Sequence, residues 1–179
     1  MVHIPIDVLR RPSLKFAFLL LLAVGCGTSL QADSQCPANV KSVPFRNSQQ
    51  HQVVVQVSIN HAAPSDFLLD TGTQMTVIDQ SLAAELHLPA SGRGSIAGVS
   101  LDGPTKFAQV ESVVVGDHLS ANQRVLVYNM SKLQQAGFAI RGLLGQDFLS
   151  QFDVFIDNAH SVLCIDDTGA LRAGMQGSR

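Results

Sequence analysis

Basic residues are scarce in this chain of 179 residues, and they are not clustered. Lys and Arg number 12 against 14 Asp and Glu, the formal net charge is −2, and two cations are adjacent only at Arg10 and Arg11. Surfaces that bind nucleic acid carry clustered Lys and Arg, so we expect no nucleic-acid partner. The length allows one domain built around one hydrophobic core.

The N-terminal region lacks a hydrophobic run long enough for a transmembrane helix. The unbroken apolar stretch at residues 16–24 is far shorter than the roughly 20 residues that cross a bilayer. Basic residues precede this stretch, and small or polar residues follow it at 25–29. This layout is typical of a secretory signal. We therefore predict that residues 1–32 are a signal segment and that the chain is exported to the periplasm or cell envelope.

Cysteine is rare as well, and Cys26 lies at the end of the signal segment. The sequence Ala23-Val24-Gly25-Cys26 resembles a bacterial lipoprotein box, although Ala23 stands where Leu is usual. Two outcomes stay open. Either Cys26 is lipidated and tethers the protein to the membrane, or the signal is cleaved elsewhere and the protein is released.

The other two cysteines, Cys36 and Cys164, lie near the two ends of the remaining chain. Exported proteins tend to pair their thiols, so a disulfide between them is one expectation. The other is two unpaired thiols, with Cys164 buried in a strand. No spacing among the cysteines and the six histidines suits a metal, and we expect neither a metal nor a cofactor.

Hydrophobic patterning predicts a mainly β domain over residues 51–166. In the first predicted strand, four apolar residues recur with a period of two: Val53, Val55, Val57 and Ile59. Further strands are predicted at 67–69, 76–78, 95–101, 105–110, 113–115, 124–128, 154–156 and 161–165, with turns at 102–104 and 116–122.

Helices are few in this prediction, and the ends of the chain carry no regular element. One short helix is capped by Asp79 or Ser81 and ends before Pro89, and a second covers residues 146–151. Residues 33–50 are polar and show no period, so they are predicted to form an arm that leads into the domain. Residues 167–179 are predicted to be a frayed tail.

Asp70 stands in an unusual place for a charged residue. It follows the apolar strand at 67–69 and precedes a second apolar strand at 76–78. A carboxylate without partners between buried strands is costly, so local groups must compensate. Gly72 permits a tight turn whose N–H groups reach the carboxylate, and the Thr71 hydroxyl can bind neighbouring backbone. The sequence therefore predicts a rigidly held carboxylate at the end of a strand.

The run Phe-Leu-Leu-Asp-Thr-Gly-Thr-Gln-Met-Thr-Val-Ile at residues 67–78 resembles the active-site motif of aspartic proteases. A second element, Leu143-Leu144-Gly145 followed by a short helix, resembles the apolar segment that runs behind the catalytic turn of those enzymes. The two elements occur in the order of the single-lobe retropepsins, and the resemblance covers residues 52–165. It implies a closed β-barrel lobe with one or two short helices, and a protein or peptide substrate.

The resemblance also implies that Asp70 is catalytic and that Thr71, Gly72 and Thr73 form the active-site turn. Peptide hydrolysis by this route uses two carboxyl groups, one to activate water and one to protonate the carbonyl oxygen. A second Asp-Thr-Gly at 167–169 follows an acidic residue and has no Leu-Leu-Gly after it, so we interpret it as a solvated turn. One usable motif per chain implies a homodimer that pairs Asp70 with its copy.

Two details of the resemblance lead to hypotheses. Thr73 stands where retropepsins usually have Ala, and its hydroxyl could donate to the Asp70 carboxylate and move activity toward acid pH. The alternative is a Thr that only satisfies the turn backbone. The hairpin around Leu101, Asp102 and Gly103 is the candidate flap over the substrate, with an ordinary surface hairpin as the alternative.

Two other functions stay open. A non-catalytic envelope binding module could retain the same fold, because no motif encodes dimerisation. A structural envelope lipoprotein would leave the carboxylate of Asp70 between apolar strands without an explanation. Replacing Asp70 with Asn distinguishes these two functions from an enzyme, because the substitution should abolish hydrolysis by an enzyme and leave a binding module active.

Overall fold

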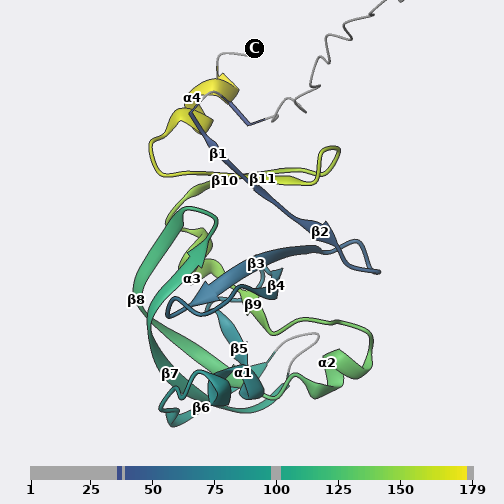
Figure 1. The fold of residues 1–179 in the computed structure, drawn as a ribbon, viewed down its shortest axis with the longest axis vertical. Helices are drawn as coiled ribbons and strands as arrows, with labels where there is room; N and C mark the ends of the chain where they lie inside the picture. The colour runs from purple at the N-terminus through teal and green to yellow at the C-terminus, as the bar shows by residue number, and fades with distance from the viewer. Residues whose placement is uncertain (1–35, 38, 98–101, 177–179) are drawn as a thin grey trace, which may run out of the picture. The chain divides into compact units, whose positions relative to one another are not determined.

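Six strands close into a β-barrel, which confirms the mainly β, closed-barrel prediction (Figure 1). In order around the barrel they are β3 (Val53–Ile59), β4 (Ser65–Leu69), β9 (Gly142–Leu144), β5 (Val77–Asp79), β8 (His118–Tyr128) and β7 (Asp102–Val115). The ring closes where Ile59 of β3 pairs with Val113 of β7. The computed structural model describes residues 36–37, 39–97 and 102–176, which lie within one unit, Asp33–Arg179.

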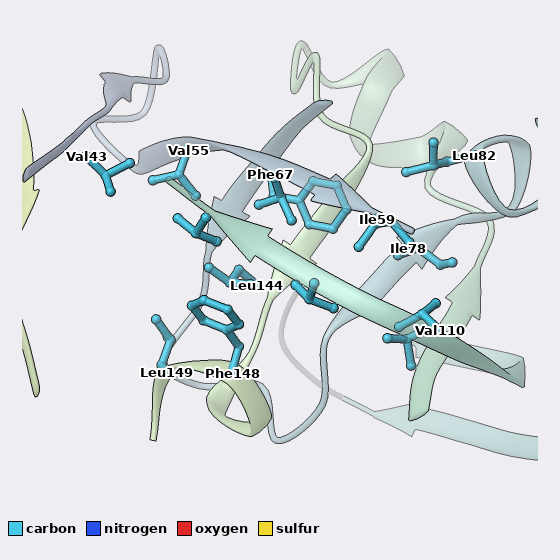
Figure 2. Close-up of a cluster of buried hydrophobic side chains, with 14 of the residues drawn as sticks. Val43, Val55, Ile59, Phe67, Ile78, Leu82, Val110, Leu144, Phe148 and Leu149 are labelled. Atoms are coloured by element: carbon cyan, nitrogen blue, oxygen red, sulfur yellow. The ribbon is translucent and has the colours of Figure 1, made fainter. Parts of the chain in front are cut away.

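Two edge strands extend the barrel sheet beyond the ring. β2 (Arg46–Asn47) pairs with β3, and β6 (Ser91–Ala97) pairs with β7. The alternation along each strand sends one set of side chains inward, where Phe67, Ile78 and Leu144 are fully buried. Figure 2 shows these side chains from separate strands gathered in one cluster with Phe148. Burying this apolar surface is the main favourable term in forming the barrel.

The opposite face of several barrel strands carries a second apolar cluster. Its buried members include Val77, Leu126 and Leu143, each adjacent in sequence to a residue of the main core. Val54 of β3 also belongs to this cluster, but Gln56 on the same face is exposed, so β3 has one strongly apolar face, as its pattern predicted. Residues buried on both faces explain why the strands around Asp70 read as continuous apolar runs.

A three-stranded sheet joins the two ends of the domain in the order β1 (Lys41–Pro44), β11 (Val162–Asp166), β10 (Asp153–Asp157). The predicted polar arm at 33–50 is therefore wrong, because β1 and β2 fall within it. Val43 and Phe45 are buried against the main core, which fixes this segment to the domain.

The described part of the C-terminal segment, up to residue 176, is regular, which contradicts the predicted frayed tail. It forms α4 (Ala170–Gln176), and Leu171 is 1% exposed. Leu171 packs in a small cluster with Cys36 and Cys164. These cysteines are joined by a disulfide with a Cα–Cα distance of 5.6 Å, so the bridge connects the start of the domain to β11.

Three further helices are short. α1 (Gln80–Glu85) begins at Asp79, whose carboxylate accepts a hydrogen bond from the Ser81 N–H at 3.2 Å, as a helix N-cap does. α3 (Gln146–Leu149) matches the predicted second helix, whereas α2 (Ser131–Gln135), like α4, was not predicted. Among the described residues, no helix is long and apolar enough to span a membrane.

The turn between β7 and β8 is tighter than predicted. Val115 pairs directly with His118, so the turn consists of Gly116 and Asp117 rather than residues 116–122. Gly116 has a φ of +58°, a conformation that glycine adopts without a steric penalty. Burial alternates at the start of β8, where His118 and Ser120 are buried and Leu119 and Ala121 are exposed, so residues 118–122 form part of a strand rather than a loop.

Candidate active site

Asp70 follows the last residue of β4 and lies beside β9. β9 runs between β4 and β5, parallel to β4 with Leu69 opposite Leu144, and antiparallel to β5 with Val77 opposite Leu143. The Asp70 N–H continues the ladder by donating to the Leu144 carbonyl at 3.0 Å. The Asp-Thr-Gly motif and the Leu-Leu-Gly element, far apart in sequence, are thus brought together by three adjacent strands.

The turn at residues 70–72 anchors one carboxylate oxygen of Asp70 and leaves the other open. The Gly72 N–H donates to Oδ1 at 2.9 Å. A Cβ atom at position 72 would lie 3.2 Å from that oxygen, so glycine allows the close approach. No described residue donates a hydrogen bond to Oδ2, and Asp70 is only half-buried. This oxygen is therefore available to water or to a second carboxyl group.

The hydroxyl of Thr73 does not bind the Asp70 carboxylate. It donates instead to the Met75 carbonyl at 3.3 Å. The hypothesis that this hydroxyl favours the ionised carboxylate is therefore wrong, and the alternative, a Thr that satisfies the turn backbone, describes the structure. The physical reason is that the Thr73 hydroxyl has one proton, and a backbone carbonyl of its own turn takes it.

The helix α3 supports the active-site turn from behind. The Gln146 N–H donates to the Thr73 carbonyl at 2.9 Å, and the Gln146 side-chain amide donates to the Thr71 carbonyl at 3.0 Å. The turn is thus fixed through its carbonyl oxygens, rather than through the Thr71 hydroxyl as the sequence suggested. Two hydrogen bonds from one residue restrict the backbone that carries the carboxylate.

Asp147 connects the same helix to the start of β5. Its carboxylate accepts hydrogen bonds from the Thr76 N–H at 2.8 Å and from the Thr76 hydroxyl at 2.7 Å. The Thr76 hydroxyl in turn accepts from the Gly145 N–H at 3.2 Å. Thr76 is fully buried, so these bonds satisfy polar groups that water cannot reach.

Gly145 is required by the close contact between β9 and the active-site turn. A Cβ atom at this position would lie 2.6 Å from the carbonyl carbon of Met75 and 2.8 Å from the Thr76 nitrogen. Both neighbours are backbone atoms that a side-chain rotation cannot move away. The Gly of the Leu-Leu-Gly element therefore keeps the two segments in register, while Leu143 and Leu144 fill the two apolar clusters.

Asp79 stabilises the strand end on the other side of the site. Its carboxylate accepts from the Met130 N–H at 3.0 Å as well as from Ser81. Burial raises the pKa of Asp79, but the Ser81 hydroxyl, the N–H groups of Met130 and Ser81, and the charge of Arg141 outweigh it, so the pKa is lowered. Asp79 is a structural carboxylate that connects α1 to the residue before α2.

The second Asp-Thr-Gly, at residues 167–169, forms a capping turn between β11 and α4. Its Asp167 is exposed, while Asp166 is buried and accepts from Thr168 N–H, the Thr168 hydroxyl and Leu171 N–H. The Thr168 hydroxyl, followed by the Leu171 N–H, lowers the pKa of Asp166 to about 2. No described hydrogen bond or ion pair connects this turn to Asp70.

The hairpin predicted as a flap consists of β6 and β7, but its turn is not at Asp102. Asp102 and Gly103 lie inside β7, opposite Ala97 and Ile96, and Leu101 lies outside the described residues. Pro104 is accommodated because pairing with β8 begins only at Lys106, and proline is tolerated in a strand with an unpaired side. Asp-Gly-Pro favours a turn, but the pairing of β7 with β6 holds these three residues in a strand.

The remaining predicted positions fall into two groups. Cys36 and Cys164 form the disulfide, which leaves the expectation of two free thiols without support. Cys26 lies outside the described residues. Within the described part of the chain, no group of three or more His, Cys, Asp or Glu side chains is arranged to hold a metal ion.

Comparison with known proteins adds independent information on this site. Residues 55–148, which include both sequence elements, match the model of a family described as aspartyl protease. The fold resembles that of a retropepsin-like aspartic protease from Rickettsia conorii, with a TM-score of 0.51 and 18% identity over 70% of this chain and 90% of the other. The EIAV protease, solved with the inhibitor HBY-793, gives a TM-score of 0.43 and 21% identity over 59% of this chain and 91% of its own. No curated protein matches significantly.

Proposed function

This chain belongs to the aspartyl protease family and has the retropepsin-like fold, and from that premise we propose that it is an endopeptidase with Asp70 as its catalytic residue. The observation that carries the proposal is the state of the Asp70 carboxylate. One oxygen is held by the Gly72 N–H at 2.9 Å, and the other is open at a half-buried position. A structural carboxylate, such as Asp79 or Asp147, has both oxygens occupied.

The proposed reaction needs two such carboxyl groups. One accepts a proton from the attacking water, and the other donates a proton to the carbonyl oxygen of the scissile peptide bond. Two adjacent carboxyl groups cannot both be ionised, so they share a proton and supply the acid and the base together. Their apparent pKa values belong to the pair and not to either residue.

A second copy of the chain is the proposed source of the second carboxyl group. No described acidic side chain forms a hydrogen bond with Asp70, and Asp167 lies in a capping turn. A two-fold symmetric dimer would place Asp70 beside its copy, with the open Oδ2 atoms facing each other. Each chain would then contribute one Asp-Thr-Gly turn and one β6–β7 hairpin to a single site.

Apolar side chains next to Asp70 favour a substrate with apolar residues around the scissile bond. Leu68 and Leu143 are paired neighbours in β4 and β9, and both belong to the second apolar cluster. Met75, three residues after Gly72 of the turn, packs on this cluster and is only partly buried. Apolar surface that remains accessible beside a reactive group is suited to bind apolar parts of a ligand. We therefore propose unfolded or extended protein segments as the substrate class.

The proposed place of action is the cell envelope. The Cys36–Cys164 disulfide supports export, because disulfides persist mainly in oxidising compartments. The N-terminal segment with its basic residues and short apolar stretch supports the same conclusion. Lipidation at Cys26 would keep the enzyme at the membrane surface. Mass spectrometry of the N-terminal peptide from the exported protein tests this, since an unmodified Cys26 or its absence would exclude the tether.

The decisive experiment mixes wild-type protein with the Asp70→Asn variant at constant total concentration. Cleavage of an unfolded protein substrate is measured from pH 3 to 8. If both carboxyl groups of a dimer are needed, activity falls with the square of the wild-type fraction. A linear decline would show that each chain acts alone, and would contradict the dimer while retaining Asp70 as catalytic.

Glu111→Gln serves as the control, because it neutralises an exposed carboxylate on β7 outside the proposed site. Mixing this variant with wild-type protein should leave activity constant. If neither the wild-type nor the variant protein cleaves at any pH or concentration, the proposal fails, and a binding module that retains the fold becomes the better description.

A further inference from the structure

A pocket of about 610 Å³ lies between α1 and the β6–β7 hairpin. None of its lining residues belongs to the Asp70 turn or to β9. Its volume is within the range of about 300–1,000 Å³ that is usual for ligand sites. The pocket is therefore distinct from the Asp70 turn, although it shares the β6–β7 hairpin with the proposed dimer site.

The wall formed by α1 and the loop after it is apolar. It presents Ala83, Ala84 and Leu88, and Ala83 is 4% exposed and part of the main core. Small alanine side chains leave room close to the helix backbone. This wall is suited to hold a compact apolar side chain of a ligand.

The opposite wall is positively charged. Arg93 of β6 and Lys106 of β7 both line the pocket, and no acidic residue does. Within the described residues, neither cation forms an ion pair, whereas Lys41, Arg46, Arg141 and Arg172 each have an acidic partner. Two unpaired cations facing a common space attract an anion.

The neutral polar groups of the pocket add hydrogen-bond donors. The Asn129 side chain uses its oxygen to accept from the Ser131 N–H at 2.9 Å, and its NH₂ group donates to no described residue. Gln80 lines the pocket and makes no hydrogen bond to a described residue. The Thr105 hydroxyl is already bound to the Val127 carbonyl at 2.7 Å. A ligand for this pocket is thus rich in acceptors, apolar at one point and negatively charged at another.

We propose that this pocket binds the C-terminal end of a peptide. The carboxylate lies between Arg93 and Lys106, the last side chain is apolar and contacts Ala84 and Leu88, and backbone carbonyls accept from Gln80 and Asn129. The identity of this ligand rests on the proposed function, because cleavage beside apolar residues releases peptides that end in this way. A fatty acid shares the carboxylate and the apolar body but has no carbonyls for the two amide side chains.

The test is calorimetric titration of the protein expressed from the full-length sequence with acetyl-Ala-Ala-Leu as the free acid, with the matching C-terminal amide, and with decanoate. The free acid should bind once per chain, and the amide at least about tenfold more weakly, since a charge-assisted interaction is lost. Binding of the free acid should weaken as salt increases. Equal affinity for acid and amide, or binding of decanoate alone, would overturn the proposal.

Four variants locate the site. Arg93→Glu and Lys106→Glu should each weaken binding of the free acid by about tenfold or more, and Ala84→Trp should abolish it by filling the pocket. Lys132→Glu, an exposed cation on α2 outside the pocket, should have no effect. An unchanged affinity in the first three variants would overturn the assignment, whatever their activity.

Cleavage assays on the same proteins separate this proposal from the proposed function. If the wild-type protein cleaves substrate and no peptide binds at the pocket, the pocket proposal alone fails. If the peptide binds with the predicted variant pattern and no cleavage is found, the proposed function fails and the binding site stands.

Discussion

Gly142 faces the ring of Phe67 so closely that no side chain fits between them: a Cβ atom at Gly142 would lie 2.1 Å from the ring. Gly142 of β9 pairs with Phe67 of β4, and the next pair along these strands is Leu143 with Leu68. The ring of Phe67 is fully buried in the main core (Figure 2). The absence of a side chain at position 142 therefore allows β9 to lie against β4.

Gly142→Ala should destabilise the fold by about 3 kcal/mol, the upper end of the cost of overpacking a core. In a Phe67→Leu background the same substitution should cost less than about 1 kcal/mol, because the ring that it meets is gone. Urea denaturation of the four proteins measures both effects. Gly174→Ala is the control, since its nearest neighbour would be Pro37 at 3.6 Å. Equal costs in the two backgrounds would contradict this contact.

The bonds between Thr76 and Asp147 should behave as one unit. Thr76→Val removes the hydroxyl and leaves Asp147 and the Gly145 N–H with fewer partners, at an expected cost of about 1–3 kcal/mol. Asp147→Ala should cost a similar amount. The double variant should be less destabilised than the sum of the two by about 1 kcal/mol or more. Additive effects in chemical denaturation would show that the two residues are not coupled.

Gln146→Met should lower the rate of substrate cleavage with little change in stability. The substitution keeps the length of the side chain and removes its hydrogen bond to the Thr71 carbonyl, worth about 0.5–1.5 kcal/mol. We expect kcat to fall by about two- to tenfold, because the turn that carries Asp70 becomes less restricted. Gln135→Met on α2 is the matched control. A fall in kcat that is equal in both variants would refute a positioning role for Gln146.

Asp166 should make stability depend on pH in the acid range. The pKa of this carboxyl is about 2 in the folded protein, below its ordinary value of 3.8. The contribution of the ionised Asp166 carboxylate to the free energy of unfolding is therefore complete above about pH 4 and is lost as the pH falls through about 2. Asp166→Asn should lower the melting temperature at pH 7, and the difference from wild type should shrink between pH 4 and pH 2. The neighbouring Asp167→Asn is the control, and a difference that stays constant with pH would contradict the assignment.

Removing the Cys36–Cys164 bridge should destabilise the domain strongly. The bridge joins residues separated by 128 positions, and the loss of such a long closed loop corresponds to about 3–5 kcal/mol in the chain-entropy model. The Cys36→Ser/Cys164→Ser variant and wild-type protein under reducing conditions should melt at the same lowered temperature. Cys26→Ser should melt as wild type does. A melting temperature unaffected by reduction would exclude a stabilising bridge.

The region around Asp70 could be predicted because its signals are local. The apolar strands before and after Asp70, the cap at Asp79 and the Leu-Leu-Gly element each depend on a few adjacent residues, and the structure contains all of them. Short range patterns of this kind reflect which face of a strand is buried. The resemblance to a protease motif rested on the same residues.

The errors concern segments whose structure depends on distant partners. β1 has only one buried residue, Val43, and exists because β11 supplies its hydrogen-bond ladder. α4 follows from the capping of its first turn by Asp166, a signal that the repeated Asp-Thr-Gly obscured. The Thr73 hydroxyl has two acceptors within local reach, and a sequence does not determine which of them a rotatable hydroxyl selects.

The place of β9 between β4 and β5 also determines when the site comes into existence. Asp70 receives its strand neighbour only from residues near 144, and the bridge at Cys36 waits for Cys164. Pairings between such distant parts of a chain form late in folding. Because a chain is synthesised from its N-terminus, it cannot make these pairings until its last third has been synthesised. A newly synthesised chain therefore cannot place Asp70 beside its strand neighbour until the segment around Leu144 has been made.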